Sequence, residues 1–208
     1  DNRKISSCYR FSYEFSPKYA ENPIHIEFSF DINSAFQQRV FAIIGQNGVG
    51  KTQLITALPL DLAKGREDLF APQVPLYSKV IAVSTSLYDS FDVPKNSVGF
   101  NYIYCGLACG KKDNKTVLAP KELKLKLLET TKTINGRERA ESLRNILSPL
   151  YSADIISALF TTQEEKLKVN QARLVEIVDY MSSGESSLLF IFCNIVANIR
   201  YDSFILFD

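Results

Sequence analysis

The sequence is poor in the side chains that most often bind metals or form covalent cross-links. It has one histidine, His25, and four cysteines, Cys8, Cys105, Cys109 and Cys193. Cys105 and Cys109 are close enough to suggest a metal-binding pair, but no second pair follows and His25 is remote. The scattered cysteines also lack the framework of a small disulfide-rich secreted domain, so we expect reduced thiols. His25 falls on the polar side of an alternating segment, which favours a surface histidine over a catalytic one.

The chain also lacks a charge imbalance and a long hydrophobic run. Its net charge is +1, so no global electrostatic argument for nucleic-acid binding can be made. The longest apolar stretch, Leu188 to Ala197, is interrupted by Asn194 and is too short to cross a bilayer. The opening residues Asp1 to Lys4 do not resemble a secretory signal. We therefore expect a soluble, cytoplasmic protein with no membrane span, although it could still dock onto a membrane partner.

What the sequence does contain is a glycine-rich loop between an apolar run and a helix-like stretch. The loop reads Gly45-Gln46-Asn47-Gly48-Val49-Gly50-Lys51-Thr52 and follows Val40 to Ile44, which we predict to be a strand. The segment Gln53 to Leu58 has the character of a helix. Strand, loop and helix in this order form the context that a phosphate-binding G-x-x-x-x-G-K-[ST] loop requires. The pattern predicts that the chain binds a nucleoside triphosphate.

Each residue type in this loop has a chemical reason to be there. Gly48 and Gly50 allow the backbone N–H groups to turn inward and form a nest for phosphate oxygens. Lys51 can reach the β- and γ-phosphates, and the hydroxyl of Thr52 can ligate Mg²⁺. The helix that begins near Gly50 adds the positive end of its dipole. ATP and Mg²⁺ are therefore the expected ligands.

The rest of the chain divides into a strand-rich part and a helical part. With 208 residues, 46% hydrophobic and 23% charged, it can form one globular domain with a substantial core. Alternating or β-branched segments predict strands in its first half. From Pro120 to about Tyr180 the pattern is helical, with interruptions. The predicted strands are 8–15, 24–30, 79–86 and 101–105, and the predicted interruptions lie near Asn135-Gly136, Pro149 and Thr161-Thr162.

The apolar residues of the helical part recur at helical spacing, which predicts core stripes rather than cofactor contacts. These stripes are Leu143, Ile146, Leu147 and Leu150, and then Leu167, Leu174, Ile177 and Val178. The stretch Gly110 to Lys126 is the most basic, with six lysines against Asp113 and Glu122. Two interpretations of it remain open: a solvated loop and helix face, or a contact with nucleic acid or a partner.

A second motif, Met181-Ser182-Ser183-Gly184-Glu185, precedes a predicted helix over 186–200. Serines and a glycine at a helix start can present hydroxyls, N–H groups and a dipole end to an anion, but a plain N-terminal cap explains them equally well. One helix later, Phe204 to Asp208 is predicted to be a buried strand that ends in an aspartate. In phosphate-loop NTPases an aspartate at this place holds the Mg²⁺ shell.

The three motifs in this order resemble the nucleotide-binding head of the ABC ATPase superfamily. Gly45 to Thr52 is similar to its Walker A motif, Met181 to Glu185 to its signature motif, and Phe204 to Asp208 to its Walker B motif. Glu185 at the fifth signature position, with the strand-rich segment before Walker A, resembles the SMC/RecF-like branch. Ala82 to Phe91 resembles a passage in bacterial phage-defence ATPases of the retron and Septu PtuA type.

This resemblance implies a fold and a set of roles. The fold is α/β, a P-loop NTPase with an ABC-type head, an antiparallel β subdomain and a helical subdomain. Residues 1–110 would form the β-rich part with Walker A, 111–180 the helical subdomain, and 181–208 the signature helix and Walker B strand. The implied catalytic residues are Lys51 and Asp208, and the implied Mg²⁺ contacts are Thr52 and Asp208. The implied nucleotide contacts are Gly45, Gln46, Asn47, Gly48, Val49, Gly50, Lys51, Thr52, Gln53, Ser182, Ser183, Gly184 and Glu185.

In the family, the signature serine contacts the γ-phosphate of the ATP held by a second subunit. Ser182 or Ser183, with Gly184, would do so here, and two protomers would enclose two ATP molecules as a C₂ dimer that hydrolysis loosens. The sequence departs from the family in three respects. The glutamate expected after Asp208 lies beyond the given residues, His25 cannot act as the switch histidine, and Asp89 stands where a Q-loop glutamine is expected. The strand ending at Asp208 suggests a fragment of a longer chain.

Four functions remain open at this stage. The first is an ATP-driven dimerising switch that controls an effector, a nuclease or toxin, in an anti-phage defence complex that could include a reverse transcriptase and its RNA. The second is a DNA-repair or chromosome-associated ATPase. The third, a transporter motor, is disfavoured because Phe36 and Phe41 are poor adenine platforms and the Q-loop glutamine is missing. The fourth is a nucleotide-bound scaffold with little turnover.

Overall fold

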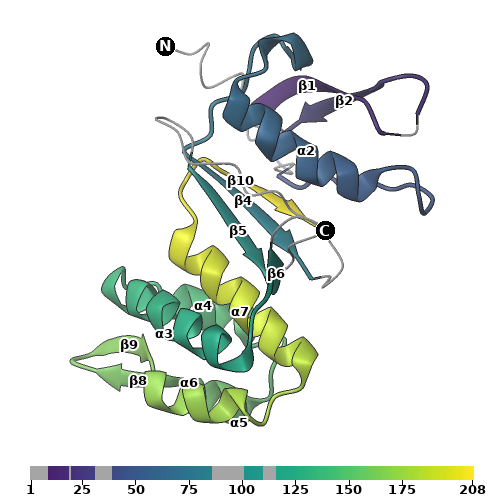
Figure 1. The fold of residues 1–208 in the computed structure, drawn as a ribbon. Helices are drawn as coiled ribbons and strands as arrows, with labels where there is room; N and C mark the ends of the chain where they lie inside the picture. Colours follow the sequence, from purple (N-terminus) through teal and green to yellow (C-terminus); the bar gives the residue numbers. More distant parts are fainter. Residues whose placement is uncertain (1–8, 19, 31–38, 86–100, 110–115) are drawn as a thin grey trace.

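The computed structural model describes residues 9–18, 20–30, 39–85, 101–109 and 116–208. Two sheets and helix α2 (Lys51–Lys64) form one half of the molecule, and a group of helices forms the other (Figure 1). Helix α7 (Ser183–Asn198) packs against strand β5 (Tyr102–Gly106) and connects the two halves.

The first sheet is antiparallel and has the order β2-β1-β3. Its strands are β1 (Arg10–Phe15), β2 (Ile24–Ser29) and β3 (Phe70–Ala71), and a 3-10 turn, η1 (Glu67–Leu69), precedes β3. The strands predicted over 8–15 and 24–30 are thus confirmed within a residue or two at the ends that the structure describes. Phe11, Tyr13 and Phe15 alternate to the buried side of β1, as expected for a strand with one face in the core. His25 is exposed, as predicted.

The second sheet is parallel and has the order β10-β4-β5. Strand β4 (Lys79–Ser84) is central, and β10 (Ser203–Phe207) pairs with it from Ser203 opposite Lys79 to Phe207 opposite Val83. One face of β4 packs in the same buried cluster as Leu54 and Leu58 of α2. The other face packs against Ile191 of α7. Parallel sheets are normally covered on both faces, and the central strand β4 is buried on both of its faces.

The helical half surrounds α7, whose side chains Leu189, Phe190 and Cys193 are buried in the largest core cluster. Two short hairpins accompany these helices, one of them next to the parallel sheet. The remaining elements are β6 (Ala108–Cys109), β7 (Thr116–Val117), α3 (Pro120–Gly136), α4 (Ala140–Leu147), α5 (Ala153–Leu159), β8 (Phe160–Gln163), β9 (Lys166–Val169) and α6 (Gln171–Val178). The helix predicted over 186–200 begins three residues earlier, at Ser183.

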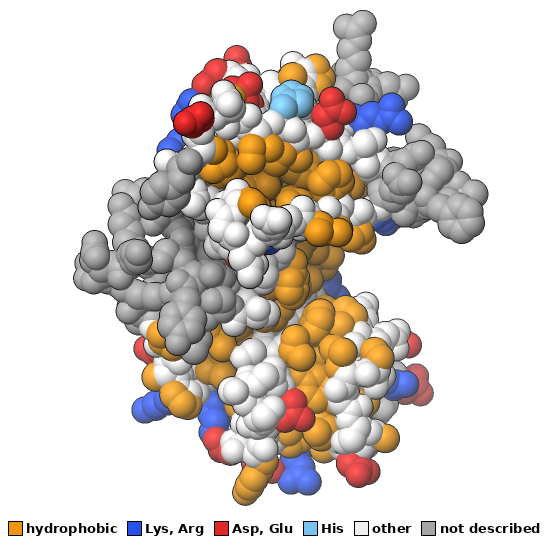
Figure 2. All heavy atoms as spheres, turned by 90° about the vertical axis from the view of Figure 1, so that its right-hand side faces the viewer, with side chains coloured by type: hydrophobic (Ala, Val, Ile, Leu, Met, Phe, Trp, Pro, Cys, Tyr) orange, Lys and Arg blue, Asp and Glu red, His pale blue; other side chains and the backbone are white. Residues whose placement is uncertain are grey.

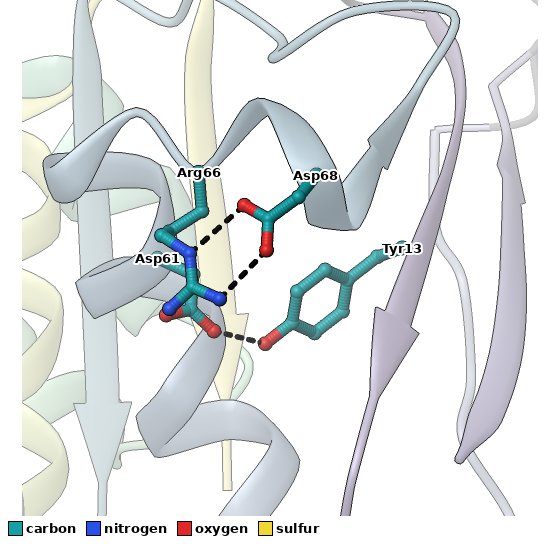
Figure 3. A network of polar contacts seen from close by, with 4 residues as sticks. All are labelled: Tyr13, Asp61, Arg66 and Asp68. Atoms are coloured by element: carbon teal, nitrogen blue, oxygen red, sulfur yellow. Dashed lines mark hydrogen bonds and ion pairs between the residues drawn. The ribbon is translucent and has the colours of Figure 1, made fainter.

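A polar network ties the antiparallel sheet to α2 (Figure 3). The phenol of Tyr13, 1% exposed, donates a 2.6 Å hydrogen bond to the carboxylate of Asp61 on α2. Just beyond the helix, Arg66 donates from Nε and Nη2 to the two carboxylate oxygens of Asp68, at 2.9 and 2.7 Å. This bidentate pair fixes the turn between α2 and η1, because two parallel hydrogen bonds set the orientation of both side chains.

The strand predicted over Val40 to Ile44 is wrong. These residues form no strand, and Val40 and Ile44 are 88% and 94% exposed. A strand needs a neighbour for its backbone groups, and among the described residues none pairs with this run. Within the part of the chain that the structure describes, strand β10 likewise pairs only with β4. On the face that is at the right in Figure 1, hydrophobic side chains gather from the sheet half down to the helical half (Figure 2).

Three smaller predictions also need correction. Phe204 to Asp208 was predicted to be a buried strand, but Ile205 and Phe207 are 38% and 51% exposed, and no described strand lies beside β10 on the side away from β4. The interruption predicted near Thr161-Thr162 is the β8–β9 hairpin over 160–169, so Leu167, predicted on a helical stripe, lies on strand β9 instead. In the first predicted stripe, Leu143 and Leu147 of α4 are buried. Ile146 on the same helix and Leu150 after it are 36% and 48% exposed.

Candidate nucleotide-binding site

The glycine-rich loop adopts a conformation that depends on two of its glycines. Gly48 and Gly50 have φ values of +90° and +99°, a region that side chains disfavour. A Cβ placed on Gly50 would also lie 3.3 Å from the Cβ of Pro17, which follows strand β1. Residues 45–49 are exposed, and α2 begins immediately afterwards at Lys51. The loop therefore presents its backbone to solvent at the start of a helix, as the phosphate-loop interpretation requires.

Lys51 is directed back over the loop that precedes it. Its ammonium donates to the carbonyl oxygen of Gly45 at 2.7 Å and to that of Gln46 at 2.9 Å. The cation thus lies inside the turn formed by residues 45–50. A phosphate entering this turn would meet the ammonium without a change in the backbone, because only the acceptors of its hydrogen bonds would be exchanged. Gln53, one turn into α2, instead accepts a 3.0 Å hydrogen bond from the backbone N–H of Lys18.

The first turn of α2 has donors that nothing in the described chain satisfies. Its N-cap residue, Gly50, has no side chain to cap it, and the N–H groups of residues 51–53 have no acceptor among the described residues. Helices α5, α6 and α7, in contrast, are capped by the side chains of Ser152, Asn170 and Ser182. Unpaired N–H groups and the helix dipole together favour an anion at this end. The Thr52 hydroxyl makes no hydrogen bond with the described residues either, so it is available to a metal ion.

Strand β10 brings Asp208 to the same half of the molecule as this loop. Asp208 follows the strand directly, and its backbone N–H donates a 3.0 Å hydrogen bond to the carbonyl oxygen of Val83. Leu206, two residues earlier, lies in one buried cluster with Leu54, near the start of α2. Asp208 therefore lies at the carboxyl ends of the parallel strands, the edge at which open α/β sheets bind ligands.

The signature-like residues lie in the other half, at the amino end of α7. Ser182 is the N-cap: its Oγ accepts from the N–H of Glu185 at 3.3 Å, and the Glu185 carboxylate accepts from the Ser182 N–H at 2.8 Å. These bonds, from the Ser182 backbone first and its hydroxyl second, lower the pKa of Glu185. The N-terminal cap that the sequence allowed as an alternative explanation is thus present, in the form of a capping box. Because α7 has 16 residues and spans about 24 Å, its two ends are well separated.

The same geometry distinguishes the two serines that the sequence left equivalent. The Ser182 hydroxyl is occupied by Glu185, whereas the Ser183 hydroxyl makes no hydrogen bond with any described residue. Both serines are exposed, and a Cβ on Gly184 would meet nothing within 4 Å. Tyr151 supports this turn, since its phenol donates a 2.6 Å hydrogen bond to the carbonyl oxygen of Glu185. Sequence reasoning missed Tyr151 because the contact joins residues 34 positions apart.

Several predicted positions lie outside the described residues. These are Cys8, Asp89, the part of the Ala82 to Phe91 passage after Thr85, and Lys111 to Lys115. Of the remaining lysines in the basic stretch, Lys124 pairs with Asp179 at 2.5 Å, as expected for a helix face rather than a ligand site. Cys105 and Cys193 are buried free thiols, in agreement with the predicted reduced state.

Other kinds of site find no support in the described residues. These residues contain no group of three or more His, Cys, Asp and Glu side chains that could hold a metal ion. Across the same part of the chain, no helix has both the length and the apolarity that spanning a membrane would need. Comparisons with protein-family models, with curated proteins and with solved structures returned no match to this chain.

Proposed function

We propose that the protein binds Mg²⁺-ATP at the loop of residues 45–52 and uses it as a dimerising switch. The observation that carries this proposal is the start of α2. Two glycines of positive φ, a lysine directed back over the loop and three N–H groups with no acceptor among the described residues converge there. A plain turn would not need this combination. The triphosphate would be held by the backbone donors and Lys51, and Thr52 and Asp208 would hold the metal ion beside it.

The second step of the proposal concerns the partner protomer. The exposed Ser183 lies in the opposite half of the chain from Lys51, so it is better placed to reach nucleotide on a second copy than on its own. A C₂ dimer would place each α7 start against the other copy's phosphate loop, which satisfies both sites at once. The γ-phosphate would supply the contacts that favour the closed dimer, and hydrolysis would remove them.

The biological output is proposed from the sequence resemblance alone. In this proposal the cytoplasmic ATPase controls an effector, a nuclease or toxin, in an anti-phage defence complex. No geometry of the described residues favours a chromosome-associated ATPase or a scaffold over it. ATP hydrolysis and control of an effector both depend on nucleotide binding, so the nucleotide site is tested first.

The nucleotide site is tested by measuring Mg²⁺-ATP binding calorimetrically with Lys51→Ala. We expect the variant to lose binding, because the phosphate charge loses its cationic partner. Lys64→Ala is the matched control: it removes a lysine from the other end of the same helix and should leave binding unchanged. Equal affinity of Lys51→Ala and wild type would contradict the assignment.

A further inference from the structure

Lys79 is a buried cation that has no hydrogen-bond or ion-pair partner among the described residues. It is the first residue of β4 and is 6% exposed, yet its ammonium makes no hydrogen bond or ion pair with any residue that the structure describes. Buried charges in proteins are normally paired, because removing an ammonium from water without a compensating partner is strongly unfavourable. The lysine stem packs on the α7 side of the sheet, since side chains alternate along β4 and Ile81 and Val83 pack there.

Arginines gather at the carboxyl end of α7, which leads into the strand that pairs with Lys79. Arg137 donates to the carbonyl oxygen of Ala197 at 2.7 Å, and Arg139 donates to those of Val196 and Ile199 at 2.8 and 2.9 Å. Arg200 follows in the chain. Its backbone N–H donates to the Ser203 hydroxyl at 2.7 Å, and Ser203 is the strand partner of Lys79.

The carboxylates near this cluster are already engaged elsewhere. Asp202 accepts from the backbone N–H of Ser78 at 3.2 Å and also from its hydroxyl, and Glu138 forms an ion pair with Lys166. The end of α7 contributes only about half a negative charge. Burial first, and then the charges of Arg200 and Arg137, lower the pKa of Lys79, as expected where like charges are not compensated.

We propose that the cluster of Lys79, Arg137 and Arg200 binds a phosphate group. Arg137 and Arg200 are exposed, and the charges of both act on the buried ammonium, so an incoming anion can meet a point charge and two guanidinium groups together. A phosphate offers several oxygens and more than one negative charge at most pH values, which matches three cations better than a single carboxylate does. Both a small phosphomonoester and a nucleic-acid backbone carry this group.

This site is separate from the glycine-rich loop. Lys79 lies at the amino end of its strand, whereas Asp208 follows the carboxyl end of the neighbouring parallel strand. The two sites therefore lie at opposite edges of one sheet. The inference does not rest on ATP binding, and its test can exclude the loop by using Lys51→Ala as the parent protein.

The test titrates inorganic phosphate into the Lys51→Ala chain and follows thermal unfolding, with sodium chloride at matched ionic strength as reference. We expect phosphate, but not chloride, to raise Tm in a saturable manner. Lys79→Met should abolish that rise and should itself melt higher without phosphate, since it removes an uncompensated buried charge. Arg200→Gln, which alters an exposed side chain and should fold, is expected to weaken phosphate binding about tenfold. Arg173→Gln, an exposed arginine on α6, is the control and should bind as the parent does.

Binding of a short fluorescent oligothymidylate, followed by anisotropy, separates the two sources of phosphate. Binding that Lys79→Met and Arg200→Gln both weaken would assign the site to a nucleic-acid backbone. A phosphate-dependent rise in Tm without oligonucleotide binding would assign it to a small phosphomonoester or free phosphate. Unchanged phosphate affinity in both variants, or no binding of either probe, would overturn the proposal.

Discussion

The phenol of Tyr13 on β1 and the carboxylate of Asp61 on α2 are joined by a 2.6 Å hydrogen bond between residues 48 positions apart. The bond fixes α2 against the antiparallel sheet one turn before the helix ends at Lys64. Pro17, which follows the same strand, lies against Gly50 at the other end of that helix. The strand and its following loop therefore hold both ends of the helix that begins with Lys51.

The first prediction concerns this hydrogen bond. Tyr13→Phe should lower the free energy of unfolding by about 1–3 kcal/mol, because a buried bond to a charged acceptor is lost while the ring remains packed. Urea unfolding measures the change. Tyr180→Phe, at a tyrosine that is 91% exposed, is the control and should change stability by less than about 0.5 kcal/mol. If Tyr13→Phe and Tyr180→Phe were equally stable, the hydrogen bond between Tyr13 and Asp61 would contribute nothing to the free energy of unfolding.

The second prediction compares two glycines with different backbone requirements. Gly50→Ala should destabilise the protein by about 1–2 kcal/mol, because it forces a side chain into positive φ. Its Cβ would also crowd Pro17 at 3.3 Å. Gly184→Ala, inside α7 with open space around it, should instead be neutral or stabilise by up to about 1 kcal/mol. Thermal unfolding of the two variants side by side tests the sign of each change, and the opposite order would contradict the loop conformation.

The third prediction concerns pH. Burial raises the pKa of the Cys193 thiol from 9.0 to about 12, and burial, opposed by Lys79, does the same for Cys105. Between these values the folded state retains protons that the unfolded state has released, so stability is complete below about pH 9 and falls as pH rises. Each thiol contributes a slope of up to about 1.4 kcal/mol per pH unit there.

Cys193→Ala isolates one of these contributions. The variant will be less stable at neutral pH because it leaves a small cavity, so the comparison is of slopes and not of absolute values. Urea midpoints at about pH 8 and about pH 10.5 should fall less steeply in the variant than in wild type. A fall of the same steepness in both proteins would mean that the thiol does not ionise on unfolding in this range.

How far the sequence predicted the structure depends on whether a feature is local. The loop at 45–52, the strand at 24–29 and the helix from Ser183 follow from glycine positions, alternation and a serine cap, which act over a few residues. Val40 to Ile44 has the same apolar character as β4, but it forms no strand because strand formation also requires a neighbour in space. Sequence pattern records the apolar run and not the partner.

The same limit applies to the candidate site. The sequence identified Ser182 and Ser183 together, but only the capping bonds to Glu185 separate their roles. Lys79 was predicted merely as the first residue of a strand. Its burial, and the charges of Arg137 after α3 and Arg200 after α7 that act on it, arise from three segments that meet only in the folded chain. Such contacts have no local signal that a single sequence could supply.

The last prediction tests the role of the α7 start in dimerisation. Ser183→Arg replaces a small exposed side chain whose hydroxyl no described residue uses, so folding and the capping box of Ser182 should be retained. ATP binding by the monomer should also be retained, because Lys51 lies in the other half. Nucleotide-dependent dimers should disappear, since a long cation at this point would clash with a second copy's loop. Light scattering with Mg²⁺-ATP measures this, with Ser157→Arg on the exposed side of α5 as control; dimers formed equally by both variants would leave α7 outside the interface.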